Sequence, residues 1–156
     1  MTGRPVKIGV IGCGNVLGAY RTAIDRLRLR GWVEVAIACG RPHQRDAACA
    51  ELGTGRFTTD EKDVTGSAEV DLVLILTPPP AHGRLARAAL EAGKHVLVEK
   101  PISTSLEEAA GLVRLALRSP GHLVSAPFTA LSPTFQTMGR RIRRGDIGKP
   151  CSARAR

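Results

Sequence analysis

Two glycines follow the first apolar segment of the chain at the spacing of a phosphate-binding turn. Residues 6–11 read as a short apolar strand, and Gly12 and Gly14 come directly after it. Glycine allows a tight backbone turn that a residue with a Cβ resists. A helical pattern follows, and the N-terminus of a helix presents free N–H groups and the positive end of its dipole. This order of strand, turn and helix suits a pyrophosphate group.

The glycines depart from the full dinucleotide fingerprint, which places a third glycine three residues after the second. Leu17 occupies that position, and Gly18 follows one residue late. We interpret the segment as the first turn of a dinucleotide-binding βαβ unit. The alternative is an ordinary strand–loop–helix junction in which the glycines serve only the turn.

The next expected strand, residues 32–38, ends beside a cation where such units usually carry an acid. An aspartate or glutamate at this place hydrogen-bonds the adenosine ribose. This chain has Gly40 and Arg41 there, which leave room and supply a planar cation for a 2′-phosphate. The sequence therefore predicts NADP in preference to NAD. The alternative is a surface turn whose arginine binds nothing.

Two further strands end where an open sheet can bind a ligand. Residues 72–76 are all apolar, as in a strand buried on both faces of a parallel sheet, and residues 95–101 form a strand that ends in charge. Open α/β sheets bind ligands at the carboxyl ends of their strands. The residues expected at these two ends are Thr77 and Pro78, then Glu99, Lys100 and Pro101.

Strands alternate with helices along the chain, which predicts an α/β fold with a doubly wound parallel sheet. The other expected strands are residues 57–59 and 122–126, and the polar residues 60–67 are expected to connect. A first helix ends at residue 29, and others cover residues 42–52, 81–92, 105–119 and 133–144. The residues predicted to face inward are Ala19, Ala23, Ile24 and Leu27 on the first helix, and Leu85, Ala88, Ala89 and Ala92 on residues 81–92. Ser105 and Glu108 are predicted to form a capping box.

Composition limits the class of protein. The chain has 156 residues, 43% of them hydrophobic, which suits one domain with a real core. No run reaches the roughly 18 apolar residues of a membrane helix. The four cysteines lack a C-x-x-C pair, so we expect reduced thiols in a cytoplasmic protein and no metal site. A net charge of +9 suits a polyanion, but only residues 140–144 cluster the cations, and we expect no nucleic-acid partner.

Three segments carry a resemblance to a known family. They are residues 8–15 (IGVIGCGN), 77–82 (TPPPAH) and 92–101 (AGKHVLVEKP). With these segments the chain resembles the nucleotide-binding half of the Gfo/Idh/MocA oxidoreductases, which include glucose–fructose oxidoreductase and inositol dehydrogenase. The third segment is the most specific. Residues 144–150 (RGDIGKP) resemble the family's entry into its second domain.

The resemblance implies a Rossmann fold and an enzyme that moves hydride between NADP or NAD and a sugar, cyclitol or related alcohol. It implies that the glycine turn holds the pyrophosphate and that Lys100 is the catalytic residue, acting on the substrate hydroxyl or carbonyl. The residues that it places at the cofactor are Gly12, Gly14, Asn15, Val16, Thr77, Pro78, His82, Glu99, Lys100 and Pro101, in addition to Gly40 and Arg41.

We expect residues 1–150 to form one dinucleotide-binding domain. Residues 151–156 are expected to begin the family's C-terminal α/β substrate domain, and the rest of that domain is expected to be absent. In the family that domain supplies most substrate contacts. The alternative to a cofactor domain of an oxidoreductase is a truncated, non-catalytic module that binds a dinucleotide or a partner protein. The expected ligands are the dinucleotide and, in the full-length family, a small polyol or sugar. No membrane partner is expected, and whether the protein forms a homo-oligomer stays an open question.

Overall fold

Six strands form one sheet in the computed structural model, which describes residues 3–126 and 128–154. They are β1 (Val6–Ile11), β2 (Val33–Cys39), β3 (Phe57–Thr58), β4 (Leu72–Ile75), β5 (His95–Val98) and β6 (Leu123–Ser125). The order across the sheet is β3-β2-β1-β4-β5-β6, and all neighbours are parallel. The strand order reverses at β1, which confirms the predicted doubly wound Rossmann sheet.

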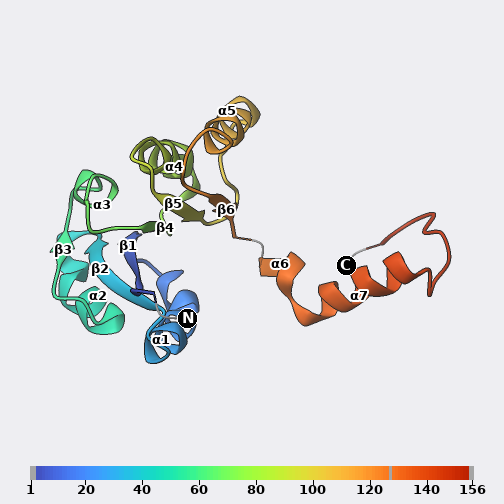
Figure 1. Ribbon diagram of the computed structural model, residues 1–156, viewed down its shortest axis with the longest axis horizontal. Helices are drawn as coiled ribbons and strands as arrows, with labels where there is room; N and C mark the ends of the chain where they lie inside the picture. Colours follow the sequence, from blue (N-terminus) through green and yellow to red (C-terminus); the bar gives the residue numbers. More distant parts are fainter. Residues whose placement is uncertain (1–2, 127, 155–156) are drawn as a thin grey trace. The chain divides into compact units, whose positions relative to one another are not determined.

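Helices cover both faces of this sheet (Figure 1). The first face is covered by α1 (Leu17–Leu29) and α2 (Arg45–Leu52), and the second by α3 (Lys62–Thr65), α4 (His82–Glu91) and α5 (Leu106–Ala116). Two 3-10 turns, η1 (Pro42–Gln44) and η2 (Pro79–Ala81), lead into α2 and α4. Consecutive strand residues point to opposite faces: Val10 belongs to the core on the α1 side and Ile11 to the core on the α4 side.

The inward faces of two helices differ from the prediction. Ala19 and Ala23 of α1 are exposed, so their predicted burial was wrong. Ile24 and Leu27 face inward as predicted, and Leu17 and Tyr20 complete the stripe, because the larger side chains at helical spacing reach the sheet. On the second face Leu85 and Ala89 are buried as predicted, and Ala88 is partly buried. Ala92 is exposed, since α4 ends one residue before it.

Local hydrogen bonds explain where some helices begin. The polar stretch 60–67, predicted to be a connection, contains α3, whose Val64 is fully buried against the sheet. Ser105 caps α5 by accepting the Glu108 N–H at 3.3 Å. The reciprocal half of the predicted capping box is absent. The Glu108 carboxylate instead accepts the Ser103 hydroxyl, and the Ser103 oxygen accepts the Ser105 N–H at 2.9 Å.

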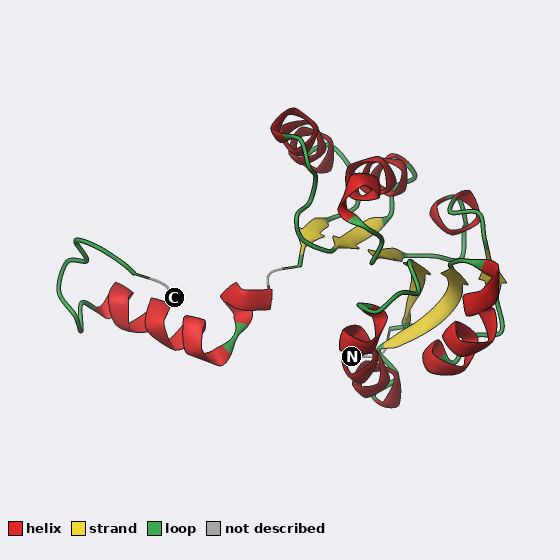
Figure 2. Cartoon of the chain, turned by 180° about the vertical axis from the view of Figure 1, so that it is seen from behind, coloured by secondary structure: helices red, strands yellow, loops and turns green. Residues whose placement is uncertain are grey.

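The chain divides into two compact units, residues 1–126 and residues 127–156. The second unit contains the short helix α6 (Phe128–Leu131), which the sequence did not predict, and α7 (Pro133–Arg144), which it did (Figure 2). Ser132 caps α7 by accepting the Phe135 N–H at 3.4 Å, and Gly145 ends it with a φ of 79°. Residues 151–154 have no regular secondary structure, and residues 155–156 lie outside the described part. The domain boundary at residue 150 stays a prediction.

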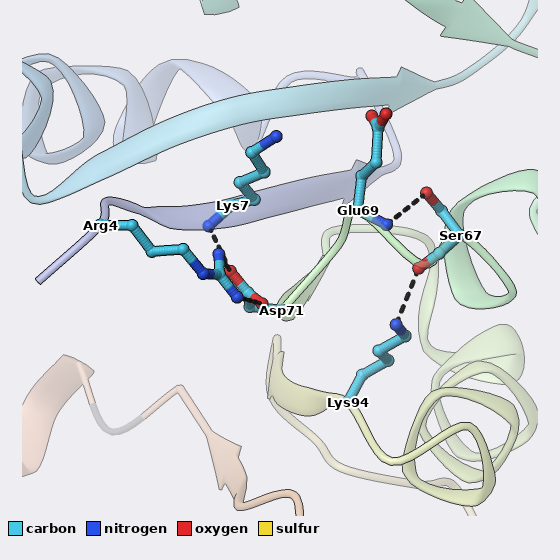
Figure 3. Close-up of polar contacts among 6 residues, drawn as sticks. All are labelled: Arg4, Lys7, Ser67, Glu69, Asp71 and Lys94. Atoms are coloured by element: carbon cyan, nitrogen blue, oxygen red, sulfur yellow. Dashed lines mark hydrogen bonds and ion pairs between the residues drawn. The ribbon is translucent and has the colours of Figure 1, made fainter.

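Asp71 ties the N-terminal ends of β1 and β4 together (Figure 3). Its two carboxylate oxygens each accept a hydrogen bond from the Arg4 guanidinium at 2.7 Å, and one of them also accepts the Lys7 N–H at 2.9 Å. The hydrogen bonds from Arg4 hold the pKa of Asp71 at about 2. Nearby, the Lys94 ammonium donates to the Ser67 carbonyl at 2.7 Å. This edge is the end of the sheet opposite to the carboxyl ends of the strands.

Within residues 3–126 and 128–154, no helix has both the length and the apolar character needed to cross a membrane. The same residues hold no cluster of three or more potential metal ligands.

Candidate functional site

A cleft of about 760 Å³ opens at the carboxyl ends of β1, β2, β4 and β5. Eleven of the twelve residues predicted to contact a cofactor line it. They are Gly12, Gly14, Asn15, Val16, Gly40, Arg41, Thr77, Pro78, His82, Glu99 and Lys100. The twelfth, Pro101, is joined to the cleft through the contact of its carbonyl with His82. A second, shallower hollow of about 620 Å³ beside β3 collects none of the predicted residues.

The glycine turn fits against two neighbouring strands. Gly12 has a φ of +103°, and its N–H donates to the Cys39 carbonyl at 2.9 Å. A Cβ on Gly12 would lie 2.7 Å from the backbone of Leu76, so this position needs glycine for both its conformation and its packing. Gly14 has no neighbour within 4 Å of an added Cβ and borders open space in the cleft.

The N-terminus of α1 is free to meet an anion. Val16 is its N-cap residue, no side chain caps it, and its first turn contains no acidic residue. The N–H groups of Leu17 and Ala19 donate to the carbonyls of Gly14 and Val16 at 3.0 and 3.1 Å, and the positive end of the helix dipole lies at this terminus. Because Gly14, Asn15 and Val16 line the cleft directly before this helix, a phosphate in the cleft can approach this terminus.

Gln44 connects the glycine turn to the end of β2, and no sequence motif indicated it. Its side-chain amide donates to the Cys13 carbonyl at 2.8 Å and accepts the Arg41 N–H at 2.9 Å. The Arg41 residue is exposed at the rim of the cleft. Glu61, another residue that the sequence did not indicate, also lines the cleft, and its carboxylate is paired with Arg84.

The two cysteines at the cleft are neutral thiols. Cys13 is half-buried and donates to the Cys39 carbonyl at 3.4 Å, and Cys39 is buried. Burial raises the pKa of each thiol to about 11. Since the thiolate is the nucleophilic form, neither cysteine is placed to act as a nucleophile at neutral pH.

His82 joins the loops after β4 and β5 from inside the protein. Only 1% of its surface is exposed, and its ring nitrogens Nδ1 and Nε2 lie 2.7 Å from the carbonyls of Pro101 and Thr77 respectively. A neutral imidazole has one N–H and can donate to only one of these carbonyls, whereas the doubly protonated ring donates to both. The Lys100–Pro101 peptide bond is cis.

Thr77 offers the cleft an unused polar group. Its hydroxyl oxygen is buried and makes no hydrogen bond with the described residues. Buried hydroxyls are normally paired, so an unpaired one beside a cleft marks a place where a ligand can complete the hydrogen bonding.

Glu99 and Lys100 lie at the β5 end of the cleft. The Glu99 carboxylate accepts a hydrogen bond from the Tyr20 hydroxyl at 2.6 Å and another from the Lys100 N–H at 3.0 Å. Lys100 is exposed at the cleft. The sequence did not single out Tyr20, because its partner lies 79 residues further along the chain.

The family model that matches residues 6–126 describes an oxidoreductase family with an NAD-binding Rossmann fold. The chain belongs to the Gfo/Idh/MocA family. This match covers the sheet, the glycine turn and both loops that His82 connects. The resemblance inferred from the sequence is thereby confirmed.

Named relatives agree with the assignment. Inositol 2-dehydrogenase 1 of Saccharopolyspora erythraea is 33% identical over 147 residues, which are 93% of this chain and 43% of that protein. The scyllo-inositol 2-dehydrogenase (NAD(+)) of Bacillus subtilis is 30% identical over 146 residues, covering 93% of this chain and 42% of that protein. The chain therefore spans less than half the length of these relatives.

A solved relative shows the same fold with ligands bound. The WlbA dehydrogenase of Bordetella pertussis, crystallised with NADH and UDP-GlcNAcA, superposes with a TM-score of 0.86 at 26% identity. The match covers 95% of this chain and 42% of that one.

Proposed function

We propose that this chain is the cofactor-binding part of an NADP- or NAD-dependent oxidoreductase that acts on a sugar, a cyclitol or a related alcohol. The observation that carries the proposal is the cleft itself. It combines an uncapped helix N-terminus, a glycine turn with open space and, after the carboxyl end of β5, the lysine Lys100. The names of the relatives, inositol dehydrogenases above all, support the substrate class.

The residues present fit a dinucleotide. The N–H groups at the start of α1 suit the pyrophosphate, and Gly14 leaves the space for it. In an open α/β sheet the ligand lies across the point where the strand order reverses, which here is β1. The adenosine half then belongs to the β2 side, at Gly40 and Arg41, and the nicotinamide half to the β4–β5 side. The unpaired Thr77 hydroxyl lies on that second side.

A bound nicotinamide would supply the site that gives or takes a hydride. The chain's own contribution to chemistry is Lys100, which is exposed at the cleft and can exchange a proton with a substrate hydroxyl or carbonyl oxygen. His82 holds the carbonyl of Pro101 and so sets the backbone that follows Lys100. The Glu99 carboxylate accepts the Lys100 N–H and fixes the same backbone from the other side.

We propose NADP as the preferred cofactor, because the β2 end of the cleft offers Arg41, an exposed cation that takes part in no ion pair among residues 3–126 and 128–154. Glu61 also lines the cleft, and its carboxylate is paired with Arg84. An arginine–phosphate contact is charge-assisted and often bidentate. NADPH carries the 2′-phosphate for this contact and NADH does not.

Calorimetric titration of the 156-residue chain with NADPH and NADH tests both the cofactor site and the preference for NADP. Arg41→Ala should weaken NADPH binding by about 1.5–3 kcal/mol, the range for a hydrogen bond to a charged group, and leave NADH binding unchanged. Arg26→Ala is the matched control, since Arg26 is an exposed arginine in the last turn of α1, away from the cleft. Equal losses for the two cofactors on Arg41→Ala would refute the NADP assignment, and absence of any binding would refute the cofactor site.

A further inference from the structure

The Glu99 carboxylate is fixed at both oxygens. Oε1 accepts the Tyr20 hydroxyl at 2.6 Å, and Oε2 accepts the Lys100 N–H at 3.0 Å. These donors come from different elements, one from the first turn of α1 and one from the loop after β5. The carboxylate therefore keeps one position at the cleft wall.

Tyr20 is a dependable donor for this contact. Its ring packs, partly buried, against the core on the α1 side of the sheet. Burial, with the hydrogen bond to Glu99 second, raises the pKa of Tyr20 well above its usual range. The hydroxyl thus keeps its proton throughout the neutral range, and the carboxylate oxygen is the acceptor.

The charge on Glu99 is not cancelled by an ion pair. None of the ion pairs formed by residues 3–126 and 128–154 includes Glu99. Lys100 follows it directly, but its side chain is exposed, and only its backbone N–H contacts the carboxylate. A partly buried carboxylate in this state exerts a stronger field on a neighbouring charge than an exposed one does.

We propose that Tyr20 and Glu99 form a fixed negative group that makes the cleft bind the oxidised cofactor more tightly than the reduced one. The inference rests on the proposed function, which assigns the β4–β5 side of the cleft to the nicotinamide. The oxidised nicotinamide ring carries one positive charge, and it becomes neutral when it accepts a hydride. A carboxylate at that end therefore attracts one form of the cofactor and not the other. Tyr20 acts as a positioning residue through Glu99.

The test compares the affinities of NADP+ and NADPH by calorimetry for the wild-type chain and three variants. Glu99→Gln keeps the shape and removes the charge, so the ratio of the two affinities should move about tenfold toward NADPH, the effect of roughly one pK unit of lost charge attraction. Tyr20→Phe should move it in the same direction, about threefold, because the carboxylate keeps its charge but loses the donor that holds Oε1 in one position at the cleft wall. Glu91→Gln is the control: it removes the same charge from the C-terminal end of α4 and should leave the ratio unchanged.

The outcomes separate this inference from the proposed function. A wild-type chain that binds none of NADP+, NADPH, NAD+ and NADH overturns both. If the chain binds only NAD+ and NADH, the ratio of those two affinities is compared in the same variants. A chain that binds both forms, with the same affinity ratio in Glu99→Gln as in wild type, overturns the inference alone. If Glu99→Gln fails to fold, Tyr20→Phe decides by the same ratio. A merely structural role for Tyr20 would weaken both forms equally, and that result also counts against the proposal.

Discussion

Gly12 and Gly14 belong to one motif, but side chains at the two positions would meet different surroundings. A Cβ at Gly12 would press on the backbone of Leu76 at 2.7 Å, in a conformation with a φ of +103° that other residues rarely adopt. A Cβ at Gly14 would meet nothing within 4 Å. A substitution at Gly14 can therefore affect ligand binding without affecting the fold, whereas a substitution at Gly12 affects the fold as well.

Gly14→Val should therefore remove cofactor binding and keep the fold. The valine side chain fills the open space before α1, and we expect the free energy of unfolding to change by no more than about 0.5 kcal/mol. Gly12→Ala should lose about 1–3 kcal/mol of stability from backbone strain alone. Urea unfolding and NADPH titration of both variants check this. Unchanged NADPH affinity in Gly14→Val would place the pyrophosphate elsewhere.

His82→Ala should destabilise the first unit strongly. The imidazole is 1% exposed, and its removal leaves a cavity and takes partners from the carbonyls of Thr77 and Pro101. We expect a loss of about 2–4 kcal/mol in the free energy of unfolding. His43→Ala is the control, because His43 is exposed on η1. The two variants are compared by urea unfolding, and similar stabilities for both would show that His82 joins the two loops only weakly.

Among the elements, β1 and β4 depend on Asp71 for a contact that responds to pH. The pKa of Asp71 is lowered by the Arg4 hydrogen bonds from 3.8 to about 2. A lowered folded-state pKa adds stability above the unfolded value, near pH 4, and that stability disappears as the pH falls through 2. Asp71→Asn should therefore melt below the wild type at pH 6, with the difference closing between pH 4 and pH 2.

Thermal melts at pH 6, 4 and 2.5 measure this effect. Asp146→Asn is the matched control, since Asp146 is exposed in the second unit and no side-chain partner is found for it among the described residues. A difference in melting temperature for Asp71→Asn that does not shrink at low pH would show that its cause is packing and not charge.

Local patterns predicted most elements of the sheet, because strands buried on both faces and glycine or serine at helix ends leave short-range signals. These patterns failed where two sets of residues on one helix have almost the same spacing. On α1, Ala19 and Ala23 fit a helical stripe as well as Leu17 and Tyr20 do. The contacts that build the site are long-range. Gln44 meets Cys13 across 31 residues, and no periodicity reveals such a pair.

At the scale of the whole molecule, α7 carries an apolar stripe opposite its arginines. Phe135, Met138 and Ile142 recur at helical spacing and are exposed, as is Leu131 at the end of α6. Phe128 is also apolar, and its side chain lies outside the described residues. Exposed apolar stripes of this kind favour association.

We therefore expect the 156-residue chain to self-associate, with an apparent mass in sedimentation velocity that rises with protein concentration. Phe135→Ser combined with Ile142→Ser should reduce the association without lowering the melting temperature, because neither residue is buried. Thr134→Ser, on the same helix and also exposed, is the control. A wild-type chain that stays monomeric at all concentrations contradicts this expectation.

The same 156 residues should bind a cofactor but turn over no sugar alcohol at an appreciable rate. Lys100 is present and exposed, yet hydride transfer needs the substrate carbon held against the nicotinamide, and such orientation is worth roughly 7–11 kcal/mol. The chain spans 43% of the length of inositol 2-dehydrogenase 1, so most of that relative has no counterpart here. Because Lys100 is exposed in a cleft that is open to water, exclusion of solvent contributes little to its reactivity.

An NADP-reduction assay with a panel of sugars and inositols, on protein shown to bind NADPH, measures this directly. We expect rates at the level of Lys100→Ala, because that variant removes the group that we assign to proton exchange with the substrate. Arg26→Ala, outside the cleft, controls for the loss of a cation. Saturable turnover that is retained in Arg26→Ala and lost in Lys100→Ala would show that these residues suffice for catalysis. The orientation of the substrate would then have to come from the cleft between the glycine turn and Lys100 itself.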